Sequence, residues 1–331
     1  MFVWCNNIKI LKILLINSII SIIKIIIKYM RKQQHAKNAK TEITGYLMGG
    51  MGNLLFIVAT CYALSKKYKS TLKFYSKMWS DSKRKNISKY DMFKNFQIDL
   101  NTIRNYNITY RENNFFYDTI HLDSCMNNCI YGYFQSYKYF DSYKTEFIKM
   151  LHNPHSKMIE SVIHRYNNDN TLTPVSIHVR RTDYLSLSHI HLNLASEYYS
   201  NAISHFSTEN SIFIIFSDDV EFIQNEPLFK NLPHRVIIDN PDDEYCFWLM
   251  SACTHNIIAN SSYSWWASYV NSNPDKLVIA PNRWFGPSGP RHKIRDIIPK
   301  THNYKLVSND STIFASSASS SVLIGSSSLG S

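Results

Sequence analysis

Residues 174–184 read PVSIHVRRTDY and predict a buried strand that ends in charged side chains. Positions 175–179 alternate small and apolar residues in a short β-branched run, which is typical of a strand. Arg180 and Arg181 follow where this strand would end, and ligands of open α/β sheets bind at the carboxyl ends of the strands. A guanidinium is a planar fork that keeps its proton and binds two oxygens at once, so both arginines suit a diphosphate.

The same arginines have a second interpretation, because they could simply pair with Asp183 at the surface. Further motifs favour a ligand site, namely GGMGNLLFIVA at 49–59, FSDD at 216–219, IIANSSYSWWASYVN at 257–271 and VIAPNRWF at 278–285. Together with HVRRTD, these motifs resemble the α-1,2-fucosyltransferase family, inverting enzymes whose HxRRxD signature binds GDP-fucose. The resemblance covers roughly residues 43–290 in the same order, which a chance match to one short pattern would not do.

The second half of the chain alternates short strands with helices, which predicts a parallel, doubly wound α/β sheet. Strands are expected at 175–179, 212–216, 235–238, 256–259 and 277–280, the last of the chain. Helices are expected at 196–205, 242–252 and 262–270. The family resemblance implies a GT-B-like fold, in which two Rossmann-like halves face each other across a cleft.

The first half begins with an expected strand, a glycine turn and a helix, at 43–48, 49–52 and 54–68. Glycines at such a junction let backbone N–H groups approach an anion at the helix N-terminus, although a purely structural turn explains them equally well. The resemblance implies that Gly52 and Asn53 contact the donor. The family carries glutamines where this chain has Leu54 and Ile57, so the contacts of those glutamines are lost.

The middle of the chain, from 70 to 170, is polar and rich in tyrosine. It predicts a strand at 70–75, a short apolar run at 130–134 and a helix at 139–151. GYFQSYKYF at 132–140 fits a family segment that precedes the donor half. Aromatic residues here could stack on acceptor sugars, but we favour the core for most of them, because buried aromatics outnumber ligand platforms.

These features divide the chain into four expected parts. Residues 1–41 form a membrane-associating or signal-anchor segment with a basic stem, and 42–165 form an acceptor-side α/β domain. Residues 170–305 form the GDP-fucose-binding α/β domain, and 306–331 form a disordered, serine-rich tail.

Residues 8–29 are the most apolar tract, although lysines interrupt it. A spanning helix needs about 20 apolar residues, and lysines near its ends can snorkel. We expect a weak signal anchor or a membrane-surface helix, with an amphipathic helix packed on the protein as the alternative. The expected location is therefore membrane-associated, as a single-pass type II protein of the Golgi or secretory lumen, and the alternative is cytoplasmic.

The overall composition describes a folded protein, with 331 residues of which 44% are hydrophobic. A formal charge of +11 admits nucleic acid, an anionic membrane or a phosphorylated substrate as partner. Zinc-finger spacing, RNA-binding aromatic signatures and a long basic helix are all absent from the sequence, so nucleic acid is not expected. The expected partners are GDP-fucose and a galactose-terminated glycan.

Sugar transfer from a nucleotide diphosphate builds negative charge on the leaving phosphate, which enzymes stabilise with a metal or with arginines and amides. The resembled family is metal-independent, which implies that Arg180 and Arg181 do this and that no metal or other cofactor is needed. Ser217, Asp218 and Asp219 end a strand. Two adjacent acids could hold a metal, but they more simply accept hydrogen bonds from a base or ribose, and the resemblance implies that Asp218 or Asp219 recognises guanosine.

Asn260, Ser261 and Ser262 also follow a strand and open a helix. Backbone amides and hydroxyls at that junction could hold the β-phosphate, and Ser262 is equally a plain N-cap. For Trp265 and Trp266 we favour packing between helix and sheet.

The base that activates the acceptor has two candidates, Asp183 beside the arginines and His178 in the same motif. Asp183 could instead only orient Arg181, and His178 on a buried strand is more typical of a core histidine. The resemblance implies inversion, in which a β-linked donor fucose becomes α-linked by backside attack. Strong stabilisation of the leaving group reduces the demand on a base, so the residues leave this role open.

The sequence therefore predicts a galactoside α-1,2-fucosyltransferase that moves L-fucose from GDP-β-L-fucose to the 2-hydroxyl of a terminal galactose. One alternative keeps the fold and changes the linkage or acceptor. Another is a catalytically silent relative that binds GDP-sugars or glycans, against which both arginines and FSDD argue. A nucleic-acid binder would show steep salt dependence and no response to GDP.

Overall fold

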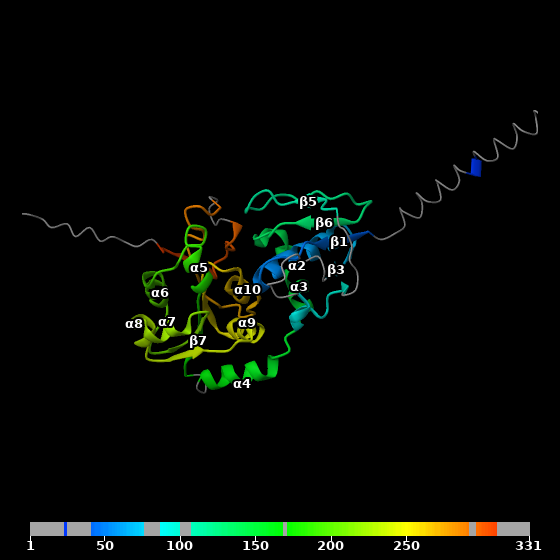
Figure 1. The fold of residues 1–331 in the computed structure, drawn as a ribbon. Coiled ribbons are helices and arrows are strands. Elements are labelled where there is room, and N and C mark those ends of the chain that lie inside the picture. Colours follow the sequence, from blue (N-terminus) through cyan, green and yellow to red (C-terminus); the bar gives the residue numbers. More distant parts are fainter. Residues whose placement is uncertain are drawn as a thin grey trace, which may run out of the picture.

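The computed structural model describes residues 23–24, 41–75, 87–99, 107–167, 171–290 and 296–309. They form two α/β halves, each built on a parallel sheet (Figure 1). The N-terminal sheet lies on the right of the figure and the C-terminal sheet on the left, with helices α2 (Met51–Lys67) and α10 (Ser262–Val270) between them. The predicted α/β, GT-B-like class is confirmed.

The C-terminal sheet has six parallel strands in the order β12-β11-β10-β7-β8-β9. Their bounds are β7 Thr173–Val179, β8 Ser211–Ser217, β9 Arg235–Ile238, β10 His255–Ile257, β11 Val278–Pro281 and β12 Tyr304–Val307. All seven residues of β7 pair with β8, and β10 pairs with its other edge. The HVRRTD motif therefore leaves the middle of the sheet at its carboxyl edge, as predicted.

Helices follow these strands in the expected alternation. They are α5 Thr182–Ser186, α6 Ser196–Ile203, α7 Val220–Asn225, α8 Pro227–Lys230, α9 Asp243–Ala252 and α10. Asp242 caps α9 by accepting hydrogen bonds from the amides of Glu244 and Tyr245, because acids are favoured at the positive end of a helix. Helix α4 (Ser156–Tyr166), which the sequence did not predict, packs against α9.

The N-terminal sheet has four parallel strands in the order β2-β1-β6-β5. Their bounds are β1 Glu42–Gly45, β2 Thr71–Leu72, β5 Tyr110–Arg111 and β6 Asn128–Tyr131. A separate parallel pair joins β3 (Phe74–Tyr75) to β4 (Ile98–Asp99). The strand expected at 70–75 is thus real but divided at Lys73, so that its two parts pair with different strands.

Helix α2 is buried on nearly every side, as expected of a helix that is apolar all round. Phe56 lies in its second turn, with its ring centroid 4.5 Å from that of Trp265 and 5.2 Å from that of Trp266 of α10. Both tryptophans are fully buried, which confirms their predicted packing role. One continuous apolar cluster therefore contains residues of both halves.

The prediction of a helix at 139–151 is wrong for the first part of this range. Two short 3-10 helices, η4 (Tyr137–Tyr139) and η5 (Asp141–Tyr143), precede α3 (Lys144–Met150). Phe140 lies between them with φ −138°, outside the helical range. This break places its ring 5.0 Å from Trp266 in a stacked arrangement, and core packing thereby overrides the local helical preference.

Two predictions about the C-terminus are also wrong. Strand 277–280 is not the last, because β12 follows and pairs in parallel with all four residues of β11. The tail predicted from residue 306 begins too early, since β12 ends at Val307 and that side chain is buried. The sequence YKLV gave little strand signal because only one of its four residues faces the core.

Residues 8–29 lie outside the described residues, except for 23–24. Within the described part of the chain, no helix is both long enough and apolar enough to cross a bilayer.

Candidate active site

The carboxyl ends of β7 and β8 bring the HVRRTD and FSDD motifs together. Asp218 accepts hydrogen bonds from the backbone amides of Arg181 at 2.9 Å and Thr182 at 3.2 Å. The Thr182 hydroxyl donates to the same carboxylate. Both oxygens of Asp218 therefore hold the backbone that leads from β7 into α5, and Thr182, which the sequence analysis did not single out, belongs to this cluster.

Arg181 is held on one side only. Its Nε donates to Asp219 Oδ2 at 3.0 Å, and its guanidinium carbon lies 3.6 Å from the centre of the Phe222 ring. Asp219 in turn caps α7 by accepting from the amide of Phe222. Among described residues, the two terminal nitrogens of Arg181 have no hydrogen-bond partner. The free end of this fork is the strongest anion-binding group of the cluster.

Arg180 is fully engaged within the protein. Its Nε and one terminal nitrogen donate to the two carboxylate oxygens of Asp183 at 2.9 and 2.8 Å. Its other terminal nitrogen lies 3.3 Å from Asp218. Burial raises the pKa of Asp183, but the hydrogen bonds and charge of Arg180 lower it, and the net pKa lies below its ordinary value. Asp183 therefore binds a proton weakly, and Arg180 occupies both its oxygens.

His178 is buried under this cluster. Its Nδ1 has no hydrogen-bond partner among described residues. Burial, reinforced by the charge of Arg180 and only partly opposed by Asp218, lowers the pKa of the imidazole to about 3. His178 is therefore neutral at physiological pH and withdrawn from solvent, which agrees with the core role favoured from the sequence.

Asn260 and Ser261 organise the junction between β10 and α10. The Asn260 side-chain amide donates to the backbone oxygens of Leu192 and Trp284 at 2.8 Å each. Asn260 thus ties together the loop after α5 and the loop after β11. Ser261, not Ser262, is the N-cap of α10, and its hydroxyl accepts from the amide of Tyr263. Ser262 is the first residue of the helix.

The first turns of α2 and α10 touch each other. A Cβ on Gly52 would lie 2.4 Å from the carbonyl carbon of Ser262 and 2.5 Å from the Tyr263 nitrogen, so the helices approach this closely only because residue 52 is glycine. Neither helix has an acidic residue in its first turn. Two positive helix ends therefore meet between the halves, where they favour an anion. Gly52 itself faces α10.

Asn53 is joined to the segment GYFQSYKYF, because the side-chain amide of Gln135 donates to Asn53 Oδ1 at 2.8 Å. Leu54 and Ile57 are fully buried, which explains the apolar residues at these two positions of α2. The turn before α2 is therefore fixed by its neighbours in the same half of the protein.

An aromatic group that the sequence analysis missed covers the arginine side of the site. The ring of His191 stacks on Tyr184 with centroids 4.4 Å apart, and the Tyr184 hydroxyl donates to the backbone oxygen of Asn260. The backbone of His191 pairs with Phe285, which follows β11. No periodic pattern marks these residues, because loop contacts between distant segments bring them together.

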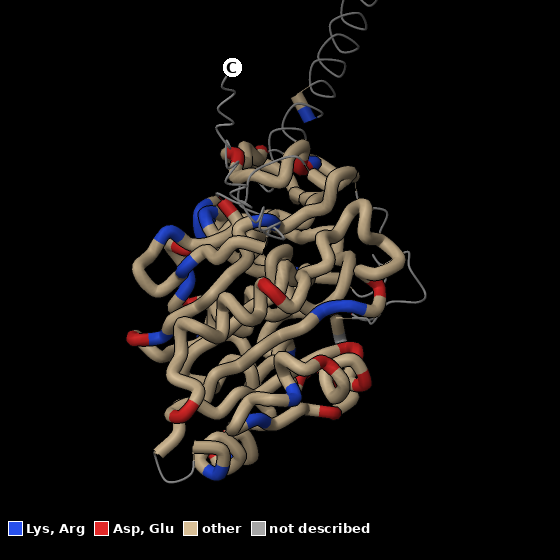
Figure 2. Tube along the Cα trace, turned by 90° about the vertical axis from the view of Figure 1, so that its left-hand side faces the viewer, with Lys and Arg blue, Asp and Glu red and all other residues tan. Residues whose placement is uncertain are grey.

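The described residues contain no group of three or more His, Cys, Asp or Glu side chains arranged to hold a metal. Acidic and basic positions are interspersed on the face shown in Figure 2. The five described cysteines are free thiols.

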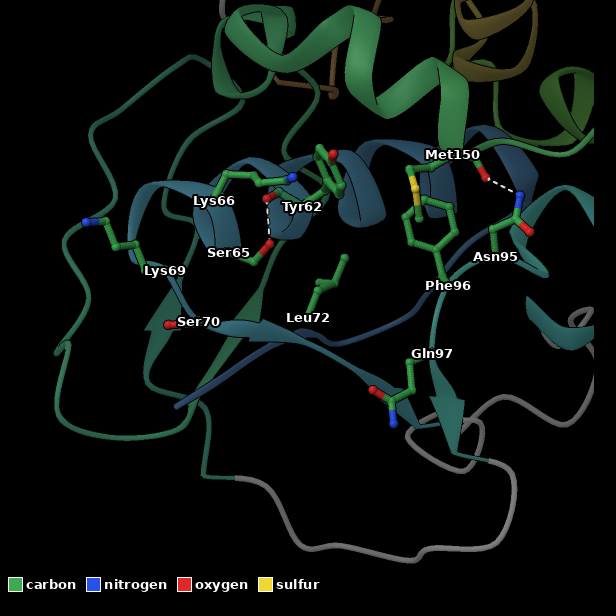
Figure 3. A pocket seen from close by; sticks show the side chains of 10 residues that line it. All are labelled: Tyr62, Ser65, Lys66, Lys69, Ser70, Leu72, Asn95, Phe96, Gln97 and Met150. Carbon is green, nitrogen blue, oxygen red and sulfur yellow. Dashed lines mark hydrogen bonds between the residues drawn. The ribbon is translucent and has the colours of Figure 1, made fainter. Parts of the chain in front are cut away.

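A cavity of about 540 Å³ lies elsewhere, at the C-terminal end of α2 (Figure 3). Lys66, Lys69 and Gln97 are among the polar residues that line it, and Leu72 and Phe96 are among the apolar ones. Helix α2 begins at the arginine side of the molecule and ends at this cavity. Its 17 residues, at a rise of about 1.5 Å per residue, separate the cavity from the site by about 25 Å.

The family model described as Glycosyl transferase family 11 matches residues 11–304. The chain belongs to this family. It is therefore a glycosyltransferase, and the resemblance stated from the sequence motifs is confirmed. The chain is 30% identical over 292 residues to the O-antigen biosynthesis glycosyltransferase WbnK of Escherichia coli, a match that covers 72% of this chain and 93% of the relative.

A second relative is the alpha-1,2-colitosyltransferase of Escherichia coli, 26% identical over 281 residues, which covers 73% of this chain and 92% of the relative. Among solved structures, the fucosyltransferase NodZ from Bradyrhizobium matches with a TM-score of 0.45 and 11% identity, covering 69% of this chain and 91% of that one.

Proposed function

We propose that this family 11 chain transfers L-fucose from GDP-β-L-fucose to the 2-hydroxyl of a terminal galactose, with inversion at the anomeric carbon. The observation that carries the proposal is the half-held Arg181 at the carboxyl edge of the central strands. Its free terminal nitrogens offer the bidentate geometry that a diphosphate needs.

The leaving diphosphate would lie between Arg181 and the paired helix ends of α2 and α10. Arg180 adds positive charge nearby while it stays bound to Asp183 and Asp218. Fixed donors of this kind stabilise charge that grows in the transition state without reorganising. The proposal therefore requires no metal and no other cofactor.

Asp218 and Asp219 act in this proposal by positioning Arg181. Asp218 holds the backbone of residue 181, and Asp219 holds its Nε. Each carboxylate oxygen already accepts a hydrogen bond, so these contacts support a positioning role more directly than the guanosine contact implied by the family resemblance.

The test uses the full chain with GDP-fucose and a β-galactoside acceptor, with and without EDTA. We expect one product with an α-1,2 linkage by NMR, at equal rates in both conditions. A different linkage, or a rate abolished by EDTA and restored by a divalent metal, would contradict the proposal.

A second donor is favoured by one comparison, the relative named as an alpha-1,2-colitosyltransferase. Colitose and fucose differ by one ring hydroxyl, so one diphosphate site could serve both GDP-sugars. Competition between GDP-fucose and GDP-colitose at equal concentrations distinguishes them. A preference for GDP-colitose of tenfold or more would replace fucose as the donor and leave the linkage unchanged.

We also propose that residues 8–29 associate the enzyme with a membrane, because this tract is the most apolar in the sequence. The check is membrane fractionation of the full chain and of a variant lacking residues 1–35. Equal membrane association of both would rule out this tract as the anchor, and recovery of the full chain in the soluble fraction would favour the cytoplasmic alternative.

A further inference from the structure

Glu112 lies at the carboxyl edge of the N-terminal sheet, directly after β5. It is partly exposed, and its position corresponds to that of Arg180 on the other sheet, since each residue follows the last residue of a parallel strand. Parallel strands place their ligand-binding groups at this edge. The sequence analysis passed over Glu112, because the surrounding polar segment carries no recognisable pattern.

The carboxylate of Glu112 is held by one oxygen only. Its Oε2 accepts hydrogen bonds from the backbone amides of Tyr133 at 2.7 Å and Phe134 at 2.9 Å, in the turn after β6. Its Oε1 accepts no hydrogen bond from the described residues. The side chain is therefore fixed in direction while one oxygen stays available to a ligand.

The turn that holds Glu112 is strained. Phe134 adopts φ +51°, a left-handed conformation that costs a residue with a side chain about 1–2 kcal/mol. Gly132 is equally constrained, because a Cβ there would lie 2.4 Å from Glu112 Cβ and 2.7 Å from its Oε2. Strain of this kind persists only where the surroundings enforce it, and it clusters at functional sites.

Three ring contacts and one backbone bridge connect this turn with the arginine side of the site. Phe115 stacks on Tyr133 with centroids 6.4 Å apart, and it meets Phe285 edge-on at 5.6 Å. Phe285 pairs with His191, whose ring stacks on Tyr184. The segments that follow Glu112 and Arg180 are thus connected, across the two halves, by contacts among these aromatic residues.

We propose that Glu112 is the general base that activates the acceptor hydroxyl in the glycosyl transfer proposed above, on which this inference rests. Glu112 Oε1 takes the proton of the acceptor hydroxyl while the hydroxyl oxygen bonds to the anomeric carbon of the donor. The bond between that carbon and the β-phosphate oxygen breaks, and its electron pair leaves with GDP. The neutral carboxyl of Glu112 afterwards returns its proton to water.

The electrostatic surroundings suit this role. Burial raises the pKa of Glu112 to about 7, against the two amide hydrogen bonds, which lower it. Tyr110 on its own strand and Tyr139 of η4 are near enough for the charge of Glu112 to act on them; burial raises the pKa of both tyrosines, the charges of Glu112 and Asp118 raise it further, and both stay neutral. A carboxyl that titrates near neutral pH is well matched to general-base catalysis.

The two earlier candidates are less suited to this step. Both oxygens of Asp183 are occupied by Arg180, and the pKa of Asp183 is lowered. His178 is buried and neutral, with its pKa near 3. Glu112, by contrast, combines an available oxygen, a fixed direction and a pKa near 7.

The experiment compares the full-length wild type with Glu112→Gln, and uses Glu146→Gln on the exposed surface of α3 as the matched control. For each protein, GDP affinity is measured by calorimetry, and kcat and KM by transfer from GDP-fucose between pH 5.5 and 9. Glutamine keeps an oxygen that accepts from the two amides but cannot take a proton.

We expect Glu112→Gln to bind GDP within about twofold of the wild type and to lose at least about 10²-fold in kcat. We expect wild-type kcat/KM to rise with pH through about 7, because the carboxylate is the active form, and this rise to disappear in the variant. Glu146→Gln should keep the wild-type rate and profile.

A kcat within threefold of the wild type in Glu112→Gln, or a reduced kcat that still rises through pH 7, would overturn the inference. If the variant does not fold, the wild-type profile decides, and a flat profile from pH 6 to 8 overturns it. A wild type that binds no GDP contradicts the proposed function itself, so the two failures are distinguishable.

Discussion

At the scale of single residues, the carboxylate of Asp218 holds the backbone that leads from β7 into α5. Asp218→Asn replaces one acceptor oxygen with a donor, so at least one of the backbone amides of Arg181 and Thr182 loses its partner. We expect the free energy of unfolding to fall by roughly 1.5–3 kcal/mol, the range for hydrogen bonds to charged groups. Urea denaturation measures this.

The exposed Glu209→Gln provides the control, since its change should stay within about 0.5 kcal/mol of the wild type. An Asp218→Asn protein as stable as Glu209→Gln would show that Asp218 does not hold the arginine backbone.

His178 predicts a specific dependence of stability on pH. Its pKa is about 3 in the folded protein, against an ordinary value of 6.5. Between these two pH values, His178 is protonated in the unfolded chain but neutral in the folded protein. The contribution of His178 to the free energy of unfolding is therefore lost as pH falls from about 6.5 toward 3. The slope is up to about 1.4 kcal/mol per pH unit.

This slope is measured as the difference in unfolding free energy between the wild type and His178→Gln at several pH values. The difference removes the opposite contribution of Glu112, whose raised pKa makes stability fall as pH rises from its ordinary 4.5 toward 7. A pH-independent difference would mean that His178 has the same pKa in the folded and the unfolded protein, which would contradict its burial as a neutral imidazole.

The sequence predicted individual site residues only in part. It located Arg180, Arg181 and both FSDD acids, because each follows a predicted strand. Their pairing could not be predicted, since Asp183 and Asp219 each could reach either arginine along the chain. Glu112 was missed because its role depends on the left-handed turn at Phe134. A glycine at that position would have indicated such a turn in the sequence, but a phenylalanine does not.

At the scale of elements, the contact between α2 and α10 depends on one glycine. In Gly52→Ala the new methyl group would meet the backbone of Ser262 and Tyr263, and overpacking of this kind costs about 1–3 kcal/mol. Gly50→Ala is the matched control, because a Cβ there meets nothing within 4 Å and its φ is −84°. Thermal and urea denaturation compare the two.

The contact also predicts weaker donor binding in Gly52→Ala, because the helix ends that attract the diphosphate move apart. Equal stability of Gly52→Ala and Gly50→Ala would contradict the close approach of the helices.

The strands of the C-terminal half were predicted well, because buried parallel strands are continuous apolar runs. Of the three helices predicted there, α6 and α9 also carry acids in their first turns. The N-terminal half was predicted poorly. Its strands have two to four residues, too short for a periodic pattern, and the helix expected at 139–151 yields to the burial of Phe140. Strand β12 was missed because it shows one buried residue at an edge.

At the scale of the whole molecule, the two halves share one apolar cluster centred on Phe56 and the tryptophans of α10. Domains with separate cores unfold independently, whereas a shared core couples them. We expect one cooperative transition by calorimetry, at the same temperature as the loss of near-UV circular dichroism. Two resolved transitions would contradict the shared core.

The central claim, that Arg181 receives the diphosphate of a guanosine donor, is tested most directly by calorimetric titration of the full chain with GDP and with UDP. The proteins are the wild type, Arg181→Ala and, as a control, Arg235→Ala, which removes a guanidinium at the start of β9. We predict that GDP binds at least tenfold more tightly than UDP, that Arg181→Ala weakens GDP binding at least tenfold, and that Arg235→Ala leaves it unchanged. Folded wild type that binds no GDP, or Arg181→Ala that binds it as well as the wild type, would contradict the account.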